Sequence, residues 1–258
     1  MSNKTPREAA SSLIVVLSLG LFVGGCQRES GNDGERLSRT DRRIDEQLAP
    51  AAALPQKEGL AAAIVIDVSG SMDEEVEGEN GRDERKIEIA RRAARDLVEQ
   101  FARYAEDHRG EPVLLGIYEF SERSGKEDCR PVIAMAPPDR DRADRALRTL
   151  RAQGGTPIGN AMIFAKRELD ATGLTRRHLL LVTDGENTDG FSPDRVALAL
   201  SRRPEAERPS LYFVAFDIEA SRFERVKEAG ALVLGATNAR DLNSTLDSLL
   251  RGNILLEK

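Results

Sequence analysis

Residues 61–71 read Ala-Ala-Ala-Ile-Val-Ile-Asp-Val-Ser-Gly-Ser, and this stretch decides how the rest of the chain is interpreted. An uninterrupted apolar run at 61–66 is typical of a strand that is buried on both faces of a sheet. Asp67, Ser69 and Ser71 follow at a spacing of two residues, and side chains two apart in extended backbone share a face. Their oxygen groups can therefore converge on one point where the strand ends.

Oxygen donors of this kind suit a hard cation such as Mg²⁺, Mn²⁺ or Ca²⁺ rather than zinc or copper. The same residue types also serve a loop that turns and satisfies its own backbone. Two interpretations therefore remain open on this segment alone, a metal site and an ordinary strand-to-loop turn.

Two further segments carry matching chemistry. They read Gly-Gly-Thr-Pro-Ile-Gly-Asn-Ala at 154–161 and Leu-Leu-Val-Thr-Asp-Gly-Glu-Asn at 180–187. With them, the chain resembles von Willebrand factor A domains over roughly residues 60–252. The resemblance rests on five residues that match, in type and order, the metal-ion-dependent adhesion site of that family: Asp67, Ser69, Ser71, Thr156 and Asp184. Taken singly, Thr156 before Pro157 also suits a helix cap, and Asp184 before Gly185 suits a turn.

The resemblance implies a role for each of these residues. Ser69 and Ser71 would ligate the ion through their hydroxyls, and Thr156 would join them directly or through water. Asp67 and Asp184 would mainly hold waters and orient the hydroxyls. Because few full negative charges would touch the ion, it would stay electrophilic and accept an Asp or Glu carboxylate from a partner protein. Mg²⁺ is the expected ion, with Mn²⁺ or Ca²⁺ as alternatives. The function expected is metal-dependent protein binding rather than catalysis.

Apolar runs alternate with segments of helical period, which is the pattern of βα units that build a mostly parallel sheet. We expect strands at 61–66, 113–120, 131–135, 178–183, 211–216 and 231–234. We expect helices at 86–105, 139–152, 157–171, 193–202, 221–229 and 239–251. The fold class predicted is α/β, a Rossmann-like, doubly wound sheet of six strands with helices on both faces.

Several helix ends carry their own signals. Ser221 and Glu224 have the spacing of a capping box, and Gly230 would end that helix. Ser192 followed by Pro193 reads as an N-cap and a first helical residue. Asp217, which closes the strand at 211–216, is interpreted as a turn residue outside the metal site.

The first 25 residues are interpreted as a secretory signal peptide, because Lys4 and Arg7 precede an uncharged stretch at 13–25. That stretch is shorter than the roughly 20 apolar residues of a spanning helix. It ends in Val-Gly-Gly-Cys, which resembles the bacterial lipobox, so Cys26 is expected to be lipidated. Gln27 after the Cys favours the outer membrane, facing the periplasm, if the source is Gram-negative. An ordinary signal peptide with a coincidental Cys is the alternative.

Segments on either side of the domain complete the organisation. Residues 26–59 are expected to be a flexible tether, with a short amphipathic helix at 39–48 as the alternative. Residues 253–258 would be a C-terminal tail.

Once Cys26 is assigned, only Cys129 is left, so no intramolecular disulfide is available and Cys129 should act as a small apolar side chain. A net charge of −6 makes nucleic acid an unlikely partner.

Two alternative functions are considered, and one acidic segment has two possible roles. A metal-dependent phosphohydrolase with Asp67 as nucleophile or base is disfavoured, because Ser69 stands where a second carboxylate is needed and the ligand motifs hold no Lys or Arg. A purely structural ion is the other rival. Residues 73–84 hold seven acidic residues in twelve and read as a solvated loop or as an electrostatic gate beside the ion.

Overall fold

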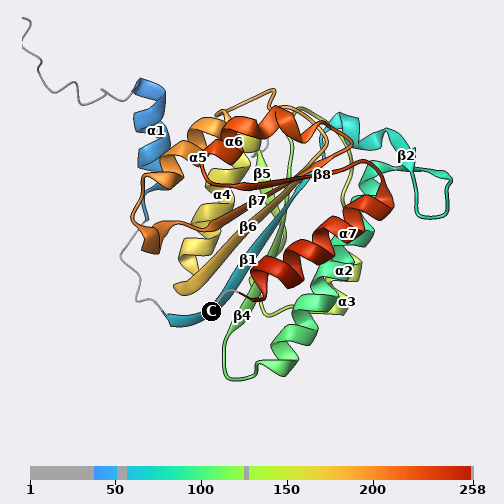
Figure 1. Ribbon diagram of the computed structural model, residues 1–258, viewed down its shortest axis with the longest axis horizontal. Coiled ribbons are helices and arrows are strands. Elements are labelled where there is room, and N and C mark those ends of the chain that lie inside the picture. The colour runs from blue at the N-terminus through green and yellow to red at the C-terminus, as the bar shows by residue number, and fades with distance from the viewer. Residues whose placement is uncertain (1–37, 51–56, 125–127, 257–258) are drawn as a thin grey trace, which may run out of the picture. The chain divides into compact units, whose positions relative to one another are not determined.

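A six-stranded sheet with strand order β5-β4-β1-β6-β7-β8 forms the centre of the protein (Figure 1). The computed structural model describes residues 38–50, 57–124 and 128–256. All neighbouring strands are parallel except β5, which runs antiparallel to β4 at one edge. The strands are β1 (Lys57–Asp67), β4 (Val113–Phe120), β5 (Cys129–Ala136), β6 (Leu174–Thr183), β7 (Ser210–Phe216) and β8 (Leu232–Ala236). The predicted α/β class and mostly parallel six-stranded sheet are confirmed.

Helices cover both faces of the sheet, as the apolar character of its strands requires (Figure 1). One face is covered by α2 (Lys86–Asp107), α3 (Arg140–Leu147) and α7 (Ala239–Leu249). The other is covered by α1 (Arg39–Leu48), α4 (Ile158–Ala171), α5 (Pro193–Ser201) and α6 (Glu224–Glu228).

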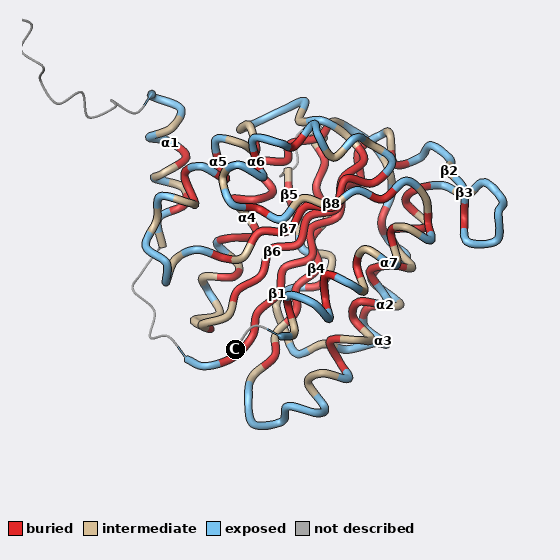
Figure 2. Tube along the Cα trace, in the orientation of Figure 1, coloured by how far each residue is buried: buried red, intermediate tan, exposed pale blue. Residues whose placement is uncertain are grey.

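Successive side chains of β1 point to opposite faces of the sheet. Ile64 and Ile66 belong to the apolar cluster under α2 and α7, whereas Ala63 and Val65 belong to the cluster on the opposite face. Figure 2 shows the resulting buried strands at the centre of the domain. Because the sheet is buried on both sides, its exposed functional groups are confined to the loops at the strand ends.

The short helix α1 lies within the segment 26–59 that was expected to be a tether. Ile44 and Leu48 are fully buried against the domain. The buried Lys166 of α4 donates a hydrogen bond to the carbonyl of Leu48 at 2.6 Å, and the Arg43 guanidinium lies 5.7 Å from the centroid of the Phe191 ring. The amphipathic helix that the sequence left as the alternative is therefore what this part of the chain forms.

Other boundaries differ from the predictions in small ways. Ser221 lies inside a 3₁₀ turn, η3 (Ala220–Phe223), and makes no side-chain cap, so the capping box predicted there is wrong. Ser192 and Pro193 do begin α5, but the Ser192 hydroxyl bonds to the Asp194 carboxylate rather than capping the helix. The chain past α7 continues as a π-helical turn, η4 (Leu250–Ile254), with Ile254 buried, so the packed domain extends beyond residue 252.

The acidic segment 73–84 forms structure of its own. It follows the 3₁₀ turn η1 (Gly70–Asp73) and contains β2 (Glu75–Glu77) and the start of β3 (Asp83–Arg85), which pair as an antiparallel hairpin. Several of its carboxylates have partners within the domain: Asp73 with Arg85, Glu84 with Arg92, and Glu79 with Asn243. The segment is thus a hairpin fastened to α2 and α7 rather than a free loop.

The structure also places the side chains of Cys129, His108 and His178. Cys129 is the first residue of β5, is buried and forms no disulfide within the described residues. His108 follows the end of α2 at the surface. His178 lies four residues inside β6 and is fully buried, because that strand begins at Leu174 rather than at 178. The described residues do not include the predicted signal peptide or residues 26–37, which contain Cys26.

Candidate metal centre

The candidate site lies where the adjacent strands β1 and β6 end. Asp67 is the last residue of β1, Thr183 is the last residue of β6, and Asp184 follows it. The two strands are parallel neighbours, with Ile66 opposite Val182. This pairing brings side chains that are more than 110 residues apart in the sequence to one edge of the sheet.

Asp67 is fully buried and its carboxylate has two fixed partners. Oδ1 accepts a hydrogen bond from the backbone N–H of Ser69 at 2.7 Å, and Oδ2 accepts one from the hydroxyl of Thr183 at 2.5 Å. Burial, followed by the charge of Asp184, raises the pKa of Asp67 to about 7. A buried carboxylate of this kind is stabilised in its ionised form by a nearby cation.

The two serine hydroxyls lie between the carboxylates. Ser69 Oγ and Ser71 Oγ are 3.1 Å apart, and Ser71 Oγ donates to Asp184 Oδ1 at 2.8 Å. Ser71 lies in η1, which is held to the loop before α4 because Gly70 N donates to the Gly154 carbonyl at 3.0 Å. Burial is also the main cause that raises the pKa of Asp184.

Thr156 is brought to the same place by the loop that follows β6. Its N–H donates to Thr188 Oγ1 at 2.7 Å, and Thr188 N donates back to the Thr156 carbonyl at 3.1 Å. A Cβ placed on Gly185 would lie 3.5 Å from Thr156 Oγ1 and 3.8 Å from Ser71 Oγ. The two hydroxyls therefore border the same glycine, and the structure brings together all five residues that the sequence singled out: Asp67, Ser69, Ser71, Thr156 and Asp184.

The glycine before Thr156 is required by this packing. A Cβ on Gly155 would lie 2.3 Å from Asp189 Oδ2 and 2.9 Å from Thr188 Oγ1. Only a residue without a side chain lets the loop approach so closely.

Several site residues were missed by the sequence analysis, and Lys86 is the most important of them. Its side chain is only 3% exposed, and Nζ lies 3.1 Å from Asp184 Oδ2, 3.0 Å from Glu74 Oε2 and 2.9 Å from Asp217 Oδ2. Burial alone would lower the pKa of Lys86, but the hydrogen bonds to Asp217 and Glu74 and the charge of Asp184 raise it above its ordinary value. The interpretation of Asp217 as a turn residue outside the site is therefore incomplete.

Asp217 has an unusual backbone as well as an ion pair. Its φ of 55° is the only positive value at a non-glycine residue among the described residues. Its N–H donates to the Ala236 carbonyl at 2.7 Å, which fixes it at the end of β7. The only sequence signal for this role was an acidic residue directly after a buried strand, next to a strand that already supplied Asp184.

The donor set fits a hard divalent cation. It consists of two carboxylates and three hydroxyls, and the residues other than Ser71 are at most 6% exposed. Among the described residues no group of three or more His, Cys, Asp or Glu side chains suits a metal ion. A cation here would therefore depend on the hydroxyls, and oxygen donors alone favour Mg²⁺, Mn²⁺ or Ca²⁺.

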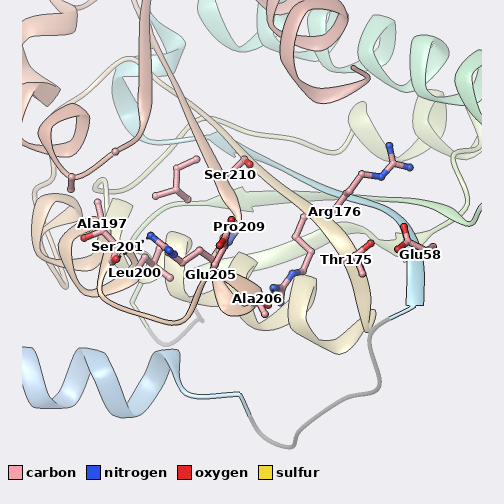
Figure 3. Close-up of a pocket in the computed structure, with 15 residues that line it drawn as sticks. Glu58, Thr175, Arg176, Ala197, Leu200, Ser201, Glu205, Ala206, Pro209 and Ser210 are labelled. Carbon is pink, nitrogen blue, oxygen red and sulfur yellow. Dashed lines mark hydrogen bonds between the residues drawn. The ribbon is translucent and has the colours of Figure 1, made fainter. Parts of the chain in front are cut away.

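A separate cavity of about 780 Å³ lies at the opposite end of β6 and β7 (Figure 3). It is lined by polar groups that include Thr175, Arg176, Arg177 and Ser210. Two of its arginines have carboxylate partners: Arg177 donates to Asp170 Oδ1 at 2.7 Å, and Arg176 forms an ion pair with Glu111. The cavity is remote from the candidate metal centre.

Comparisons with known proteins agree with this fold. Residues 62–186, which include all five site positions, match the family model for the von Willebrand factor type A domain. The uncharacterized protein YwmD of Bacillus subtilis (strain 168) is 27% identical over 150 residues, which cover 56% of this chain and 63% of that protein.

Two solved structures illustrate the likeness. The pilus adhesin SpaC from Lactobacillus rhamnosus GG has a TM-score of 0.57 at 14% identity, covering 78% of this chain and 31% of that one. The von Willebrand factor type A structure from Catenulispora acidiphila has a TM-score of 0.53 at 20% identity, covering 74% and 42% respectively. In all three relatives the match spans less than two thirds of the relative's own length. At such identities the structural likeness shows the fold alone. The chain therefore has the fold of von Willebrand factor type A domains, and residues 62–186 are similar to that family.

Proposed function

We propose that this protein is a divalent-metal-dependent protein-binding module. The observation that carries the proposal is the convergence of Asp67, Ser71 and Asp184 at the ends of β1 and β6. The hydroxyl of Ser71 donates to Asp184 and lies 3.1 Å from the hydroxyl of Ser69, whose backbone N–H donates to Asp67. Ser69, Ser71 and Thr156 would hold the cation through neutral hydroxyls, and Asp67 and Asp184 would orient those hydroxyls and bound waters. A bound Mg²⁺ would supply an electrophilic centre that accepts an Asp or Glu carboxylate of the partner.

The relatives support an interaction role in a general way. SpaC is described as a pilus adhesin, and it shares the fold of this chain. Such a role at the bacterial cell envelope is part of our proposal, with the chain attached through a lipid on Cys26. No helix in the described parts of the chain is long and apolar enough to cross a membrane. Mass spectrometry of the mature N-terminus tests the anchor: a diacylglyceryl-modified Cys26 is expected, and an unmodified start downstream of it would contradict it.

The structure gives a further reason to disfavour a phosphohydrolase. The sequence motifs contain no cation that could neutralise a phosphate, but the fold brings Lys86 beside Asp184 at 3.1 Å. That ammonium is buried and already contacts three carboxylates, so it has no free face for a phosphate. We therefore do not expect catalysis of phosphoester hydrolysis.

Metal and partner binding test the proposal together. Envelope proteins should be captured by the immobilised full chain in detergent with Mg²⁺, but not with EDTA and not by Asp67→Ala. Asp144→Ala, which removes a half-exposed carboxylate on α3, is the matched control and should capture normally. A partner should tighten Mg²⁺ binding in calorimetry, since ligands that bind the same state stabilise each other's complexes. Capture that is unchanged by EDTA would contradict the proposal, and Mg²⁺ binding that no partner tightens would favour a purely structural ion.

A further inference from the structure

Lys86 is the one ammonium of the described residues that touches the candidate metal centre. It starts α2, yet its side chain turns into the domain and is almost fully buried. Around it lie carboxylates from three separate segments: Glu74 after η1, Asp184 after β6 and Asp217 after β7. Burying a charge in this way is costly unless it is paired, so the site is built around a fixed positive charge.

The two oxygens of Asp184 have opposite surroundings. Oδ1 accepts from the Ser71 hydroxyl, which belongs to the proposed ligand set, whereas Oδ2 lies against the Lys86 ammonium. The ammonium thus offsets part of the charge of Asp184 on the side away from the hydroxyls. It also lies against Glu74 and Asp217, so its single positive charge offsets one of the three negative charges of this cluster.

We propose that Lys86 is an internal cation that limits the net negative charge of the metal centre. The bound divalent ion therefore still attracts the carboxylate of a partner. The inference rests on the proposed function, because it concerns the same site. The physical basis is electrostatic. Each negative charge placed near a bound cation makes the cation bind more tightly to the protein, and it also weakens the attraction of that cation for an external anion. Lys86 is a positioning residue, since it acts through Asp184 and does not belong to the ligand set.

Three matched variants separate this role from simple structural support. Lys86→Met removes one positive charge with little change in volume, and Lys86→Arg keeps the charge. Asp217→Asn removes one negative charge from the same cluster. Asparagine tolerates the left-handed backbone at this position, so the loop should keep its shape. Lys227→Met, which removes an exposed lysine paired with Glu224 on α6, is the control.

The measurement is Mg²⁺ affinity of the full chain in detergent, by calorimetry at pH 7.5 and low ionic strength, with thermal unfolding in EDTA and in Mg²⁺. Charge balance predicts opposite signs: Lys86→Met binds Mg²⁺ roughly tenfold more tightly and Asp217→Asn several-fold more weakly. The Mg²⁺ affinity of Lys86→Arg should be closer to that of the wild type than the affinity of Lys86→Met is. The Mg²⁺ affinity of the control Lys227→Met should equal that of the wild type. The Lys86→Met protein should also gain more in melting temperature from Mg²⁺ than the wild type, because its carboxylates lack a counter-charge in EDTA.

The possible failures are distinguishable. A wild-type chain that binds no Mg²⁺ overturns the proposed function itself. Wild-type binding together with weaker binding in both Lys86→Met and Asp217→Asn would mean that Lys86 only supports the fold, and the inference would be wrong. If Lys86→Met does not fold, Glu74→Gln provides the same charge test as Asp217→Asn, and unchanged Mg²⁺ affinity in both would also overturn the inference.

Discussion

The hydroxyl of Ser71 donates a hydrogen bond of 2.8 Å to Oδ1 of Asp184, which lies 113 residues later in the chain. Ser71 lies in the turn after β1, and Asp184 follows β6. Their contact is possible because these two strands are parallel neighbours whose carboxyl ends meet at one edge. The relationship links the two most separated parts of the candidate metal centre.

Replacing Ser71 by alanine should weaken Mg²⁺ binding while the domain stays folded. The variant removes one hydroxyl donor from the set and leaves Asp184 Oδ1 without its serine partner. We expect a loss of at least tenfold in affinity, which corresponds to about 1.4 kcal/mol. Calorimetry measures it, with Ser244→Ala on the exposed side of α7 as the control. Equal affinities for the two variants would contradict the assignment of Ser71.

Thr183→Val should destabilise the domain because it removes the hydroxyl that donates to Oδ2 of the buried Asp67. A buried acceptor left without its donor costs about 1–3 kcal/mol in the free energy of unfolding. Urea unfolding in EDTA measures this, and Thr149→Val, which alters an exposed threonine on the turn after α3, should change stability far less. A Thr183→Val protein as stable as the wild type would show that this hydrogen bond does not support Asp67.

Gly159→Ala tests the close packing of α4 against the loop before α5. A Cβ at this position would lie 2.1 Å from the carbonyl oxygen of Phe191, so backbone must move. We expect a loss of about 1–3 kcal/mol in the free energy of unfolding. Gly252→Ala is the matched control, since a Cβ there meets nothing within 4 Å. Similar stabilities of both variants would be inconsistent with the described packing.

His178 should make stability depend on pH in acid. Burial, followed by the charge of Arg176, lowers its pKa to about 4, whereas an unfolded histidine has a pKa near 6.5. Between these values the unfolded state binds more protons than the folded state, so stability is full above about pH 6.5 and falls as the pH drops toward 4. The slope contributed is at most about 1.4 kcal/mol per pH unit.

Two measurements isolate this histidine from the carboxylates. In NMR, the ring signal of His178 should stay that of a neutral imidazole down to about pH 5. Unfolding of His178→Asn should show a shallower pH dependence from 6.5 to 4 than unfolding of His108→Asn. A His178 signal that titrates near 6.5 would contradict its burial as the neutral form.

Local patterns predicted the parts of the fold that they control. The apolar runs before Asp67 and Asp184 marked the central strands, and the order of hydroxyl and carboxylate residues marked the candidate site. The hairpin of β2 and β3 was missed because its strands are three residues long and mostly charged, without the apolar alternation that indicates a strand. The antiparallel direction of β5 was not specified either, since direction depends on how a connection crosses the sheet.

Lys86 and the docking of α1 could not be predicted for a different reason. The sequence placed Lys86 at the start of a helix, where a lysine is usually solvated, and only the tertiary arrangement of η1, β6 and β7 surrounds it with carboxylates. The docking of α1 depends on a buried lysine of α4 that bonds to the Leu48 carbonyl. Both are contacts between distant segments, which a local pattern does not contain.

A crystal of the protein soaked in Mn²⁺ would locate the bound cation. We expect one anomalous difference peak at the ends of β1 and β6, bordered by the side-chain oxygens of Ser69, Ser71 and Thr156, and we expect no such peak in Asp67→Ala crystals. The absence of a peak there, or a peak held by other residues, would contradict the proposed metal centre.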